Sequence, residues 1–399
     1  MSGPLNGVRI LDLTNVLMGP LATQMLGDMG ADVIKVEGPE GDTVRGVGPG
    51  RSRGMGPIFV NLNRSKRSVV LDLKQQAGRD ALLRLAATAD VFVSNVRPKA
   101  LKKLGLDYAA LAAVRPDIIY ASLVGYGQNG PYAEWPAYDD LIQGAVGIPS
   151  LTAAVGDGEP RYVPLTLADR MVGLTAVGHI NAALFHRQKT GQGQQIEIPM
   201  FETMATHVLG DHLGGLTYDP PIGTWGYRRL LSRQRRPYRT RDGHLCVLIY
   251  SDRQWTSFLT AVGRADALED PRFADITSRT KHIDELYGEL AEIMATRTTD
   301  EWTAMLREFD IPNMPLNTPE TLLDDAHLKA VGLVRDSAHP SEGGLRLLGE
   351  PTRWSKTQPG SHRPVPRLGE HTQDVLREAG LSAQDIAALS GGGASNAAK

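Results

Sequence analysis

The strongest constraint on the fold is a strand–helix–strand pattern at the start of the chain. Val8–Leu13 is a mostly apolar run of strand length, and Asp32–Glu37 is a second one. Between them, apolar residues recur at helical spacing from Pro20, which suits a first helical turn, until Gly30. Two strands joined by one helix predict a parallel pair with a right-handed crossover.

The same alternation continues along the chain. Further strands are expected at Ser68–Leu73, Val91–Ser94 and Ile118–Leu123, and a further helix is expected at Gln76–Ala89. Repeated β and α units predict an α/β fold with an open parallel sheet and helices on both faces, a Rossmann-like architecture. Ligands of such sheets bind beyond the carboxyl ends of the strands, so function is expected in the loops after Leu13, Glu37, Ser94 and Leu123.

A change in residue composition along the chain predicts the domain boundaries. Thr217–Asp242 is rich in proline, glycine and arginine, and the segment after it has the pattern of a smaller α/β unit. The last 70 or so residues lack a core pattern of their own and are expected to pack on the first domain. We therefore predict a large domain of residues 1–220 and 320–399, a small domain of residues 221–319, and a mobile low-complexity tail at Ser390–Lys399.

Composition excludes several classes of protein. Of the 399 residues, 41% are hydrophobic and 22% charged, and the net charge of −2 gives no reason to expect binding to nucleic acid or a membrane surface. A single cysteine, Cys246, excludes an intrachain disulfide and a cysteine-rich metal site. No secretory leader pattern or membrane-length apolar run is present, so we expect a cytoplasmic protein.

Common catalytic motifs are missing from the sequence. There is no Gly-x-Ser-x-Gly elbow, no Walker loop and no His-Glu-x-x-His. The turn after the first strand, Thr14–Pro20, is too poor in glycine for a dinucleotide fingerprint, which argues against a dehydrogenase.

A series of short segments resembles the class III CoA-transferase family, which includes formyl-CoA transferase, carnitine CoA-transferase and the α-methylacyl-CoA racemases. The matching segments fall in family order and cover nearly the whole chain. They are Leu11–Pro20, Gly30–Glu37, Asn63–Lys74, Ser94–Pro98, Gly125–Pro131, Pro136–Asp139, Leu167–Asp169, Lys189–Gln194, Asp270–Phe273 and Leu368–Thr372. Each segment is weak alone, but ten in order are specific. The resemblance implies a Rossmann-like fold and an interlocked homodimer.

The resemblance implies that Asp169 is the catalytic nucleophile. In the family, the matching aspartate attacks an acyl-CoA, forms a mixed anhydride and then an aspartyl-CoA thioester, and passes CoA to a second acid. The sequence alone also permits a structural role, since Asp169 precedes a helix expected from Arg170 and aspartate is a favoured N-cap. In either role, the positive end of the helix is expected to keep the carboxylate ionised.

Six positions match the family's CoA site, and Arg97 lies beside them as a seventh candidate CoA contact. The six are Val16, Leu71, Lys74, Asn95, Val96 and Lys103. The three cations are expected phosphate partners, with a solvated surface as the alternative for each. CoA is implied as part of the substrate, and neither a permanently bound cofactor nor a metal is expected. Two departures are visible, because Gly38 replaces an arginine that helps hold the nucleotide and Leu17 replaces a polar residue near the acyl group. The second argues against the oxalate–formate pairing.

Leu17, Tyr138 and Asp139 are the candidates for the acyl site. The racemases carry a histidine base where this chain has Tyr138, and tyrosine, with an ordinary pKa near 10, is a poor base at neutral pH. A transferase is therefore favoured over a racemase. Asp139 is either a supporting carboxylate or a helix cap. A CoA-binding protein without catalysis is the alternative from another class, and Asp169 argues against it.

An arginine-rich segment follows the first domain, with seven arginines in Tyr227–Arg241. It is either a solvated or subunit-interface patch or a site where one or two arginines bind a second carboxylate of the acyl group. The second alternative favours succinyl-CoA as the donor and a carboxylic acid, such as a dicarboxylate, as the acceptor.

Overall fold

The structure, a computed structural model, describes residues 3–391 of the chain, and the tail predicted to be mobile lies mostly outside them. These residues form two compact units. The first comprises residues 3–146, 164–205 and 327–391, and the second comprises residues 147–163 and 206–326. The sequence predicted domain boundaries at residues 220 and 320. The observed division differs from that prediction most in residues 147–163, which belong to the second unit.

A six-stranded parallel sheet forms the centre of the first unit. Its strands, in spatial order, are β3 (Lys66–Val70), β2 (Asp32–Glu37), β1 (Arg9–Leu13), β4 (Val91–Ser94), β5 (Ile119–Val124) and β6 (Gln194–Pro199). This 3-2-1-4-5-6 order is that of doubly wound dinucleotide-binding sheets. The predicted mixed α/β fold with an open parallel sheet is therefore confirmed.

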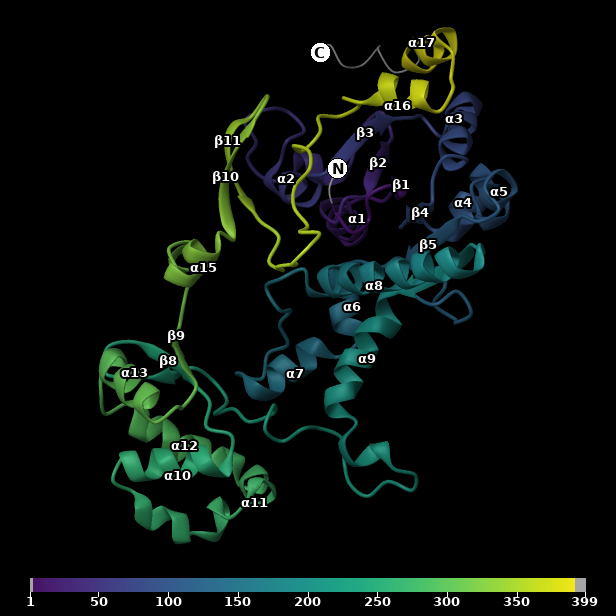
Figure 1. The fold of residues 1–399 in the computed structure, drawn as a ribbon. Helices are drawn as coiled ribbons and strands as arrows, with labels where there is room; N and C mark the ends of the chain where they lie inside the picture. Colours follow the sequence, from purple (N-terminus) through teal and green to yellow (C-terminus); the bar gives the residue numbers. More distant parts are fainter. Residues whose placement is uncertain (1–2, 392–399) are drawn as a thin grey trace. The chain divides into compact units, whose positions relative to one another are not determined.

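Helices cover both faces of this sheet because alternate strand residues point to opposite sides. Leu11 and Leu13 belong to a core that also contains apolar residues of five helices. These are α3 (Gln76–Ala86), α4 (Pro98–Leu104), α5 (Tyr108–Val114), α16 (Thr372–Glu378) and α17 (Ala383–Gly391). Asp12 points to the other face, where its carboxylate accepts a hydrogen bond from Thr23 of α1 (Met18–Asp28). There α1 packs against α8 (Leu167–Thr190), which runs beside β5 (Figure 1).

Helix α8 has 24 residues and is the longest of the described helices. It ends at Thr190, and the next residue, Gly191, has a φ of +71°, which glycine adopts readily. The length would suffice for a bilayer, but among the described residues no helix is both long and apolar enough to cross one.

The remaining elements of the first unit are short. They are η1 (Thr43–Gly46), α2 (Pro57–Leu62), α6 (Asp139–Ala145), and the antiparallel pair β10 (Val334–His339) and β11 (Gly343–Leu348). Two further helices, α9 (Met200–His212) and α15 (Ala326–Val331), span the limits between the units. The C-terminal segment packs on the first unit, where Arg67 of β3 pairs with Glu378 of α16.

The second unit has its own core around a three-stranded antiparallel sheet of β7 (Tyr238–Arg239), β8 (His244–Val247) and β9 (Asn313–Pro315). Its other elements are α7 (Ile148–Val155), η2 (Gly214–Thr217), α10 (Asp252–Ala261), η3 (Ala265–Glu269), η4 (Pro271–Phe273), α11 (Ile276–Lys281), α12 (Ile283–Met294), α13 (Thr299–Glu308) and α14 (Pro319–Leu323). Reciprocal capping boxes begin α10 at Ser251 and α13 at Thr298, which explains where these helices start.

The predicted third strand, Ser68–Leu73, was misplaced. The observed β3 begins two residues earlier, at Lys66, and ends at Val70. Lys66 and Arg67 are both buried in the strand and paired with acidic residues, Lys66 with Asp12 at 3.1 Å and Arg67 with Asp32 at 2.6 Å. The apolar pattern excluded these residues because charged side chains are rarely buried without such partners.

Candidate active site

A cavity of about 290 Å³ lies at the carboxyl ends of the strands in the first unit. Its walls come from three loops that follow β1, β4 and β5, and from the first turn of α8. This is the edge at which doubly wound sheets bind ligands, and three of the four loops selected from the sequence supply wall residues directly. The fourth, after β2, leads to Thr43, which also lines the cavity.

Asp169 lines this cavity from the third position of α8. The predicted capping role is wrong, because the helix begins at Leu167 and Thr166 occupies the N-cap position. Within residues 3–391 no group donates a hydrogen bond to the Asp169 carboxylate. Its backbone N–H donates to Oδ1 of Asp139 at 2.9 Å. The carboxylate is therefore held at the cavity wall by its backbone and is left unpaired toward the cavity.

The pKa of Asp169 is raised from 3.8 to about 7. Burial is the main cause, because it removes water from the charged form, and the nearby charge of Asp139 adds to it. The positive charge of Arg170 opposes the rise. The expectation that the positive end of the helix keeps Asp169 ionised is therefore wrong, because at neutral pH the protonated form is populated beside the carboxylate.

Asp139 is buried at the start of α6 and connects this helix to the beginning of α8. One carboxylate oxygen accepts the Asp169 N–H, and the other accepts a hydrogen bond from Gln143 Nε2 at 2.6 Å. Gln143 also donates to the carbonyl oxygen of Leu165, at 3.2 Å. Asp139 therefore acts on Asp169 in two ways, by fixing its backbone and by raising its pKa.

Five more residues singled out from the sequence meet at this cavity: Val16, Leu17, Asn95, Arg97 and Tyr138. Asn95 forms a reciprocal pair with Asn15, donating to its carbonyl oxygen at 2.9 Å and accepting its N–H at 3.0 Å. Arg97 is exposed and makes no ion pair within the described residues. The structure thus brings a free guanidinium and the proposed nucleophile to one cavity.

The other four predicted CoA contacts are not among the residues that line this cavity. Leu71 is buried in the core of the first unit, and Val96 packs partly against the same core. Lys74 and Lys103 are exposed, Lys74 just after β3 and Lys103 in the last turn of α4. Leu71 therefore acts as a core residue in this structure, whereas the two lysines are accessible to solvent.

Sequence reasoning missed the aromatic wall of the cavity. Trp135 lines it, stacks on Tyr132 with ring centroids 4.2 Å apart, and packs edge-on against Tyr126. Gln128, which also lines the cavity, holds this loop by donating to the carbonyl oxygens of Tyr126 and Ala133. The available signal was the cluster of aromatic residues just before Tyr138.

The arginine-rich segment lies in the second unit, and contacts within that unit hold part of it. Arg229 donates to the Tyr287 hydroxyl at 3.0 Å, and Arg241 pairs with Glu301 at 3.4 Å. Exposed side chains in the segment include Arg228, Arg235 and Arg239. The predicted contact with a substrate carboxylate stays a prediction.

Known proteins resemble this chain over nearly its whole length. The family described as "CoA-transferase family III" matches residues 5–372. The succinate–glutarate CoA-transferase of Agrobacterium fabrum is 35% identical over 94% of this chain and 95% of its own length. The mouse succinyl-CoA:glutarate CoA-transferase is 33% identical over 94% of this chain and 86% of its own. A crystal structure of a CAIB/BAIF family protein from Brucella suis covers 95% of this chain and all of its own, with a TM-score of 0.79 and 33% identity.

Proposed function

This chain belongs to CoA-transferase family III, and we propose that it moves CoA from succinyl-CoA to a second carboxylic acid, with Asp169 as the covalent nucleophile. The observation that carries the proposal is the placement of Asp169. Its carboxylate lines a cavity at the ligand-binding edge of the sheet and has no hydrogen-bond donor within residues 3–391. An unpaired carboxylate in such a place is available to attack a substrate.

The proposed chemistry keeps the activation of the thioester within the enzyme. A carboxylate oxygen of Asp169 attacks the succinyl carbonyl carbon, the C–S bond breaks, and CoA leaves as a thiolate from a mixed anhydride. The thiolate then attacks the aspartyl carbonyl, which releases succinate and forms an aspartyl-CoA thioester. The acceptor carboxylate attacks the aspartyl carbonyl carbon of this thioester, the C–S bond breaks, and a second mixed anhydride forms between Asp169 and the acceptor. The released CoA thiolate then attacks the acceptor's acyl carbon, which forms the new acyl-CoA and frees the Asp169 carboxylate.

The raised pKa of Asp169 supports this role. With a pKa of about 7, a large fraction of the side chain is ionised at neutral pH, and the anion is poorly solvated because the site is partly buried. Carboxyl groups with strongly shifted pKa values in a cavity are candidates for catalysis. Asp139 favours the same conclusion, because Asp169 forms no ion pair within the described residues and has a second acid beside it.

CoA is expected to enter over the loops that follow β1 and β4. Val16, Asn95 and Arg97 line the cavity there, and the free guanidinium of Arg97 suits a phosphate group. Lys74 and Lys103 are exposed and are proposed as partners of the nucleotide phosphates, while Leu71 and Val96 support the site from the core.

The acyl group is expected to lie against Leu17, Tyr138 and Trp135. Relatives named for succinate or succinyl-CoA and glutarate support succinyl-CoA as the donor and a dicarboxylate as the acceptor. The interlocked homodimer, the cytoplasmic location and the lack of a permanently bound cofactor or metal stay predictions from the family resemblance and the sequence.

The test is a transfer assay with a panel of acids. Purified protein is incubated with succinyl-CoA and glutarate, other dicarboxylates or monocarboxylates, and the acyl-CoA products are identified by mass spectrometry. We expect a new ester for at least one dicarboxylate and none with Asp169→Asn. A racemase would instead incorporate deuterium at the α-carbon of an acyl-CoA without exchanging the ester. A protein that binds CoA but forms no ester with any acid would refute the proposal.

A further inference from the structure

The loop between β1 and α1 contains a backbone conformation that its residue does not favour. Val16 has a φ of +68°, in the left-handed region. A β-branched side chain is rare there because its Cβ crowds the backbone carbonyl oxygen. Such a residue stays in place only when its surroundings hold it, and such positions gather at functional sites. Val16 lines the cavity beside Asp169, so whatever holds it also shapes that site.

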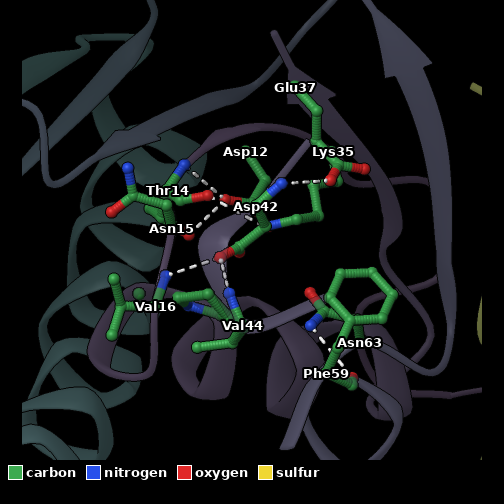
Figure 2. A network of polar contacts seen from close by, with 12 residues as sticks. Asp12, Thr14, Asn15, Val16, Lys35, Glu37, Asp42, Val44, Phe59 and Asn63 are labelled. Carbon is green, nitrogen blue, oxygen red and sulfur yellow. Dashed lines mark hydrogen bonds and ion pairs between the residues drawn. The ribbon is translucent and has the colours of Figure 1, made fainter. Parts of the chain in front are cut away.

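A buried carboxylate holds this residue. Oδ1 of Asp42 accepts the backbone N–H of Val16 at 3.1 Å and that of Val44 at 3.2 Å. Oδ2 accepts a hydrogen bond from Nζ of Lys35 at 2.9 Å, and the same ammonium donates to the carbonyl oxygen of Thr14, also at 2.9 Å. Figure 2 shows these contacts converging under the loop. Lys35 and Asp42 therefore hold the loop between β1 and α1 by hydrogen bonds at two points, Thr14 and Val16.

The pair is shielded from water, so its hydrogen bonds have no substitute. The side chains of Lys35 and Asp42 are 0% and 1% exposed. Asp42 is itself fixed, because its own N–H donates to Glu37 Oε1 at 3.0 Å, and Glu37 forms a two-point ion pair with Arg45. A buried pair of this kind loses most when one partner alone is changed, since the other charge is left uncompensated.

The chemistry of the contact requires a carboxylate. One oxygen of Asp42 faces an ammonium and the other faces two backbone N–H groups, so both must accept hydrogen bonds. Asparagine has nearly the same shape but only one acceptor oxygen. In Asp42→Asn the amide NH₂ must therefore face either the Lys35 ammonium or the Val16 N–H, and one of these two contacts is lost.

We propose that Asp42, with Lys35, is a positioning residue for CoA binding that acts by holding Val16 in its left-handed conformation at the wall of the cavity. This inference rests on the proposed function, since it takes the cavity to be the CoA site. Asp42 does not itself line the cavity; it contacts the loop through Val16 and is followed in the chain by Thr43, which also lines the cavity. Asn95 of the loop after β4 also holds the Val16 loop, through its two hydrogen bonds with the backbone of Asn15.

The test compares the wild type, Asp42→Asn, Val16→Gly and the double variant. The affinity for CoA is measured by titration calorimetry, and the stability of each protein is measured by thermal unfolding. Asp42→Asn is expected to bind CoA about tenfold more weakly or worse, which corresponds to the usual preference of a non-glycine residue against the left-handed conformation. Glycine adopts that conformation freely. The same Asp42→Asn change is therefore expected to weaken binding less in the Val16→Gly background. In turnover, KM for the acyl-CoA is expected to rise more than kcat falls.

Asp28→Asn is the matched control. Asp28 is also a buried carboxylate of the first unit, paired with Arg64 at 2.6 Å, but neither residue lines the cavity. It is expected to lower the unfolding temperature without weakening CoA binding in the folded protein. Equal weakening by Asp28→Asn and Asp42→Asn, or an identical effect of Asp42→Asn in both Val16 backgrounds, would overturn the positioning role.

A second variant covers the case in which Asp42→Asn does not fold. Val16→Pro leaves the buried ion pair intact but removes the N–H and fixes φ near −65°. It is expected to fold and to bind CoA at least about tenfold more weakly, by the same conformational preference. Wild-type affinity in this variant would overturn the inference. If the wild type itself binds no CoA, the proposed function fails. If the wild type binds CoA and the folded Asp42→Asn variant binds it equally well, only the positioning role is contradicted.

Discussion

Asp169→Asn is expected to stabilise the fold at neutral and alkaline pH, although it removes the proposed nucleophile. Burial and the charge of Asp139 raise the pKa of Asp169 from 3.8 to about 7. At 1.36 kcal/mol for each pH unit, a difference of about 3 units is worth about 4 kcal/mol. Because Asp169 is only partly buried and lines a cavity, water screens part of this cost, and we expect about 2 kcal/mol.

The sign depends on which state holds the proton more tightly. In the unfolded chain an aspartate titrates near its ordinary pKa of about 3.9. Between about pH 4 and pH 7, the folded protein therefore keeps a proton on Asp169 that the unfolded chain has lost. The wild type loses stability as the pH rises through this window, and the loss levels off above pH 7. Asparagine has no proton to lose, so the gain from Asp169→Asn is absent near pH 4 and largest above pH 7.

Calorimetric unfolding of both proteins between pH 4.5 and 8.5 measures this difference. A gain of about 2 kcal/mol corresponds to a rise in Tm of about 4 °C or more for a unit of this size. Asp140→Asn, an exposed carboxylate on the neighbouring helix, is the control and is expected to give no such pH-dependent gain. A gain from Asp169→Asn that is equal at pH 5 and pH 8, or a loss at pH 8, would refute the reasoning.

Three further predictions concern activity. Asp139→Asn keeps the acceptor for the Asp169 N–H but removes the like charge, so the acid limb of the profile of kcat/KM against pH is expected to move to lower pH; an unchanged limb contradicts this. In Gly173→Ala the new Cβ would lie 2.7 Å from the first carbonyl oxygen of α1, so we expect about 1–3 kcal/mol lower stability and impaired transfer. Gly178→Ala, with no atom within 4 Å, is its control and is expected to be neutral or about 1 kcal/mol stabilising. Arg97→Ala is expected to raise KM for acyl-CoA about tenfold or more with little change in kcat, and steady-state kinetics would contradict this if kcat alone fell.

The sheet of the first unit was largely predictable because its strands are short apolar runs between helices. β2 and β4 have the predicted bounds, β1 begins one residue later than predicted, and β5 is shifted by one residue at both ends. β3 was shifted because it contains Lys66 and Arg67, whose burial depends on Asp12 and Asp32 from neighbouring strands. Such partners lie more than thirty residues away, and an apolar pattern contains no information about them.

The position of the site was predictable, but its electrostatics were not. The rule for doubly wound sheets and the family resemblance together placed Asp169, Val16 and Asn95 at one cavity. The pKa of Asp169 went the opposite way to the expectation, since burial and the charge of Asp139 raise it. The contact of Asp42 with Val16 was equally hidden, because a left-handed valine is visible only in the folded backbone.

The central claim is that Asp169 carries the acyl group and then CoA, and trapping the intermediate tests it most directly. The enzyme is mixed with succinyl-CoA alone, treated with hydroxylamine or borohydride, digested and analysed by mass spectrometry. The account predicts modification of the peptide that contains Asp169, its dependence on the donor, and its absence in Asp169→Asn. Modification of a different residue, or transfer by Asp169→Asn at the wild-type rate, would contradict it.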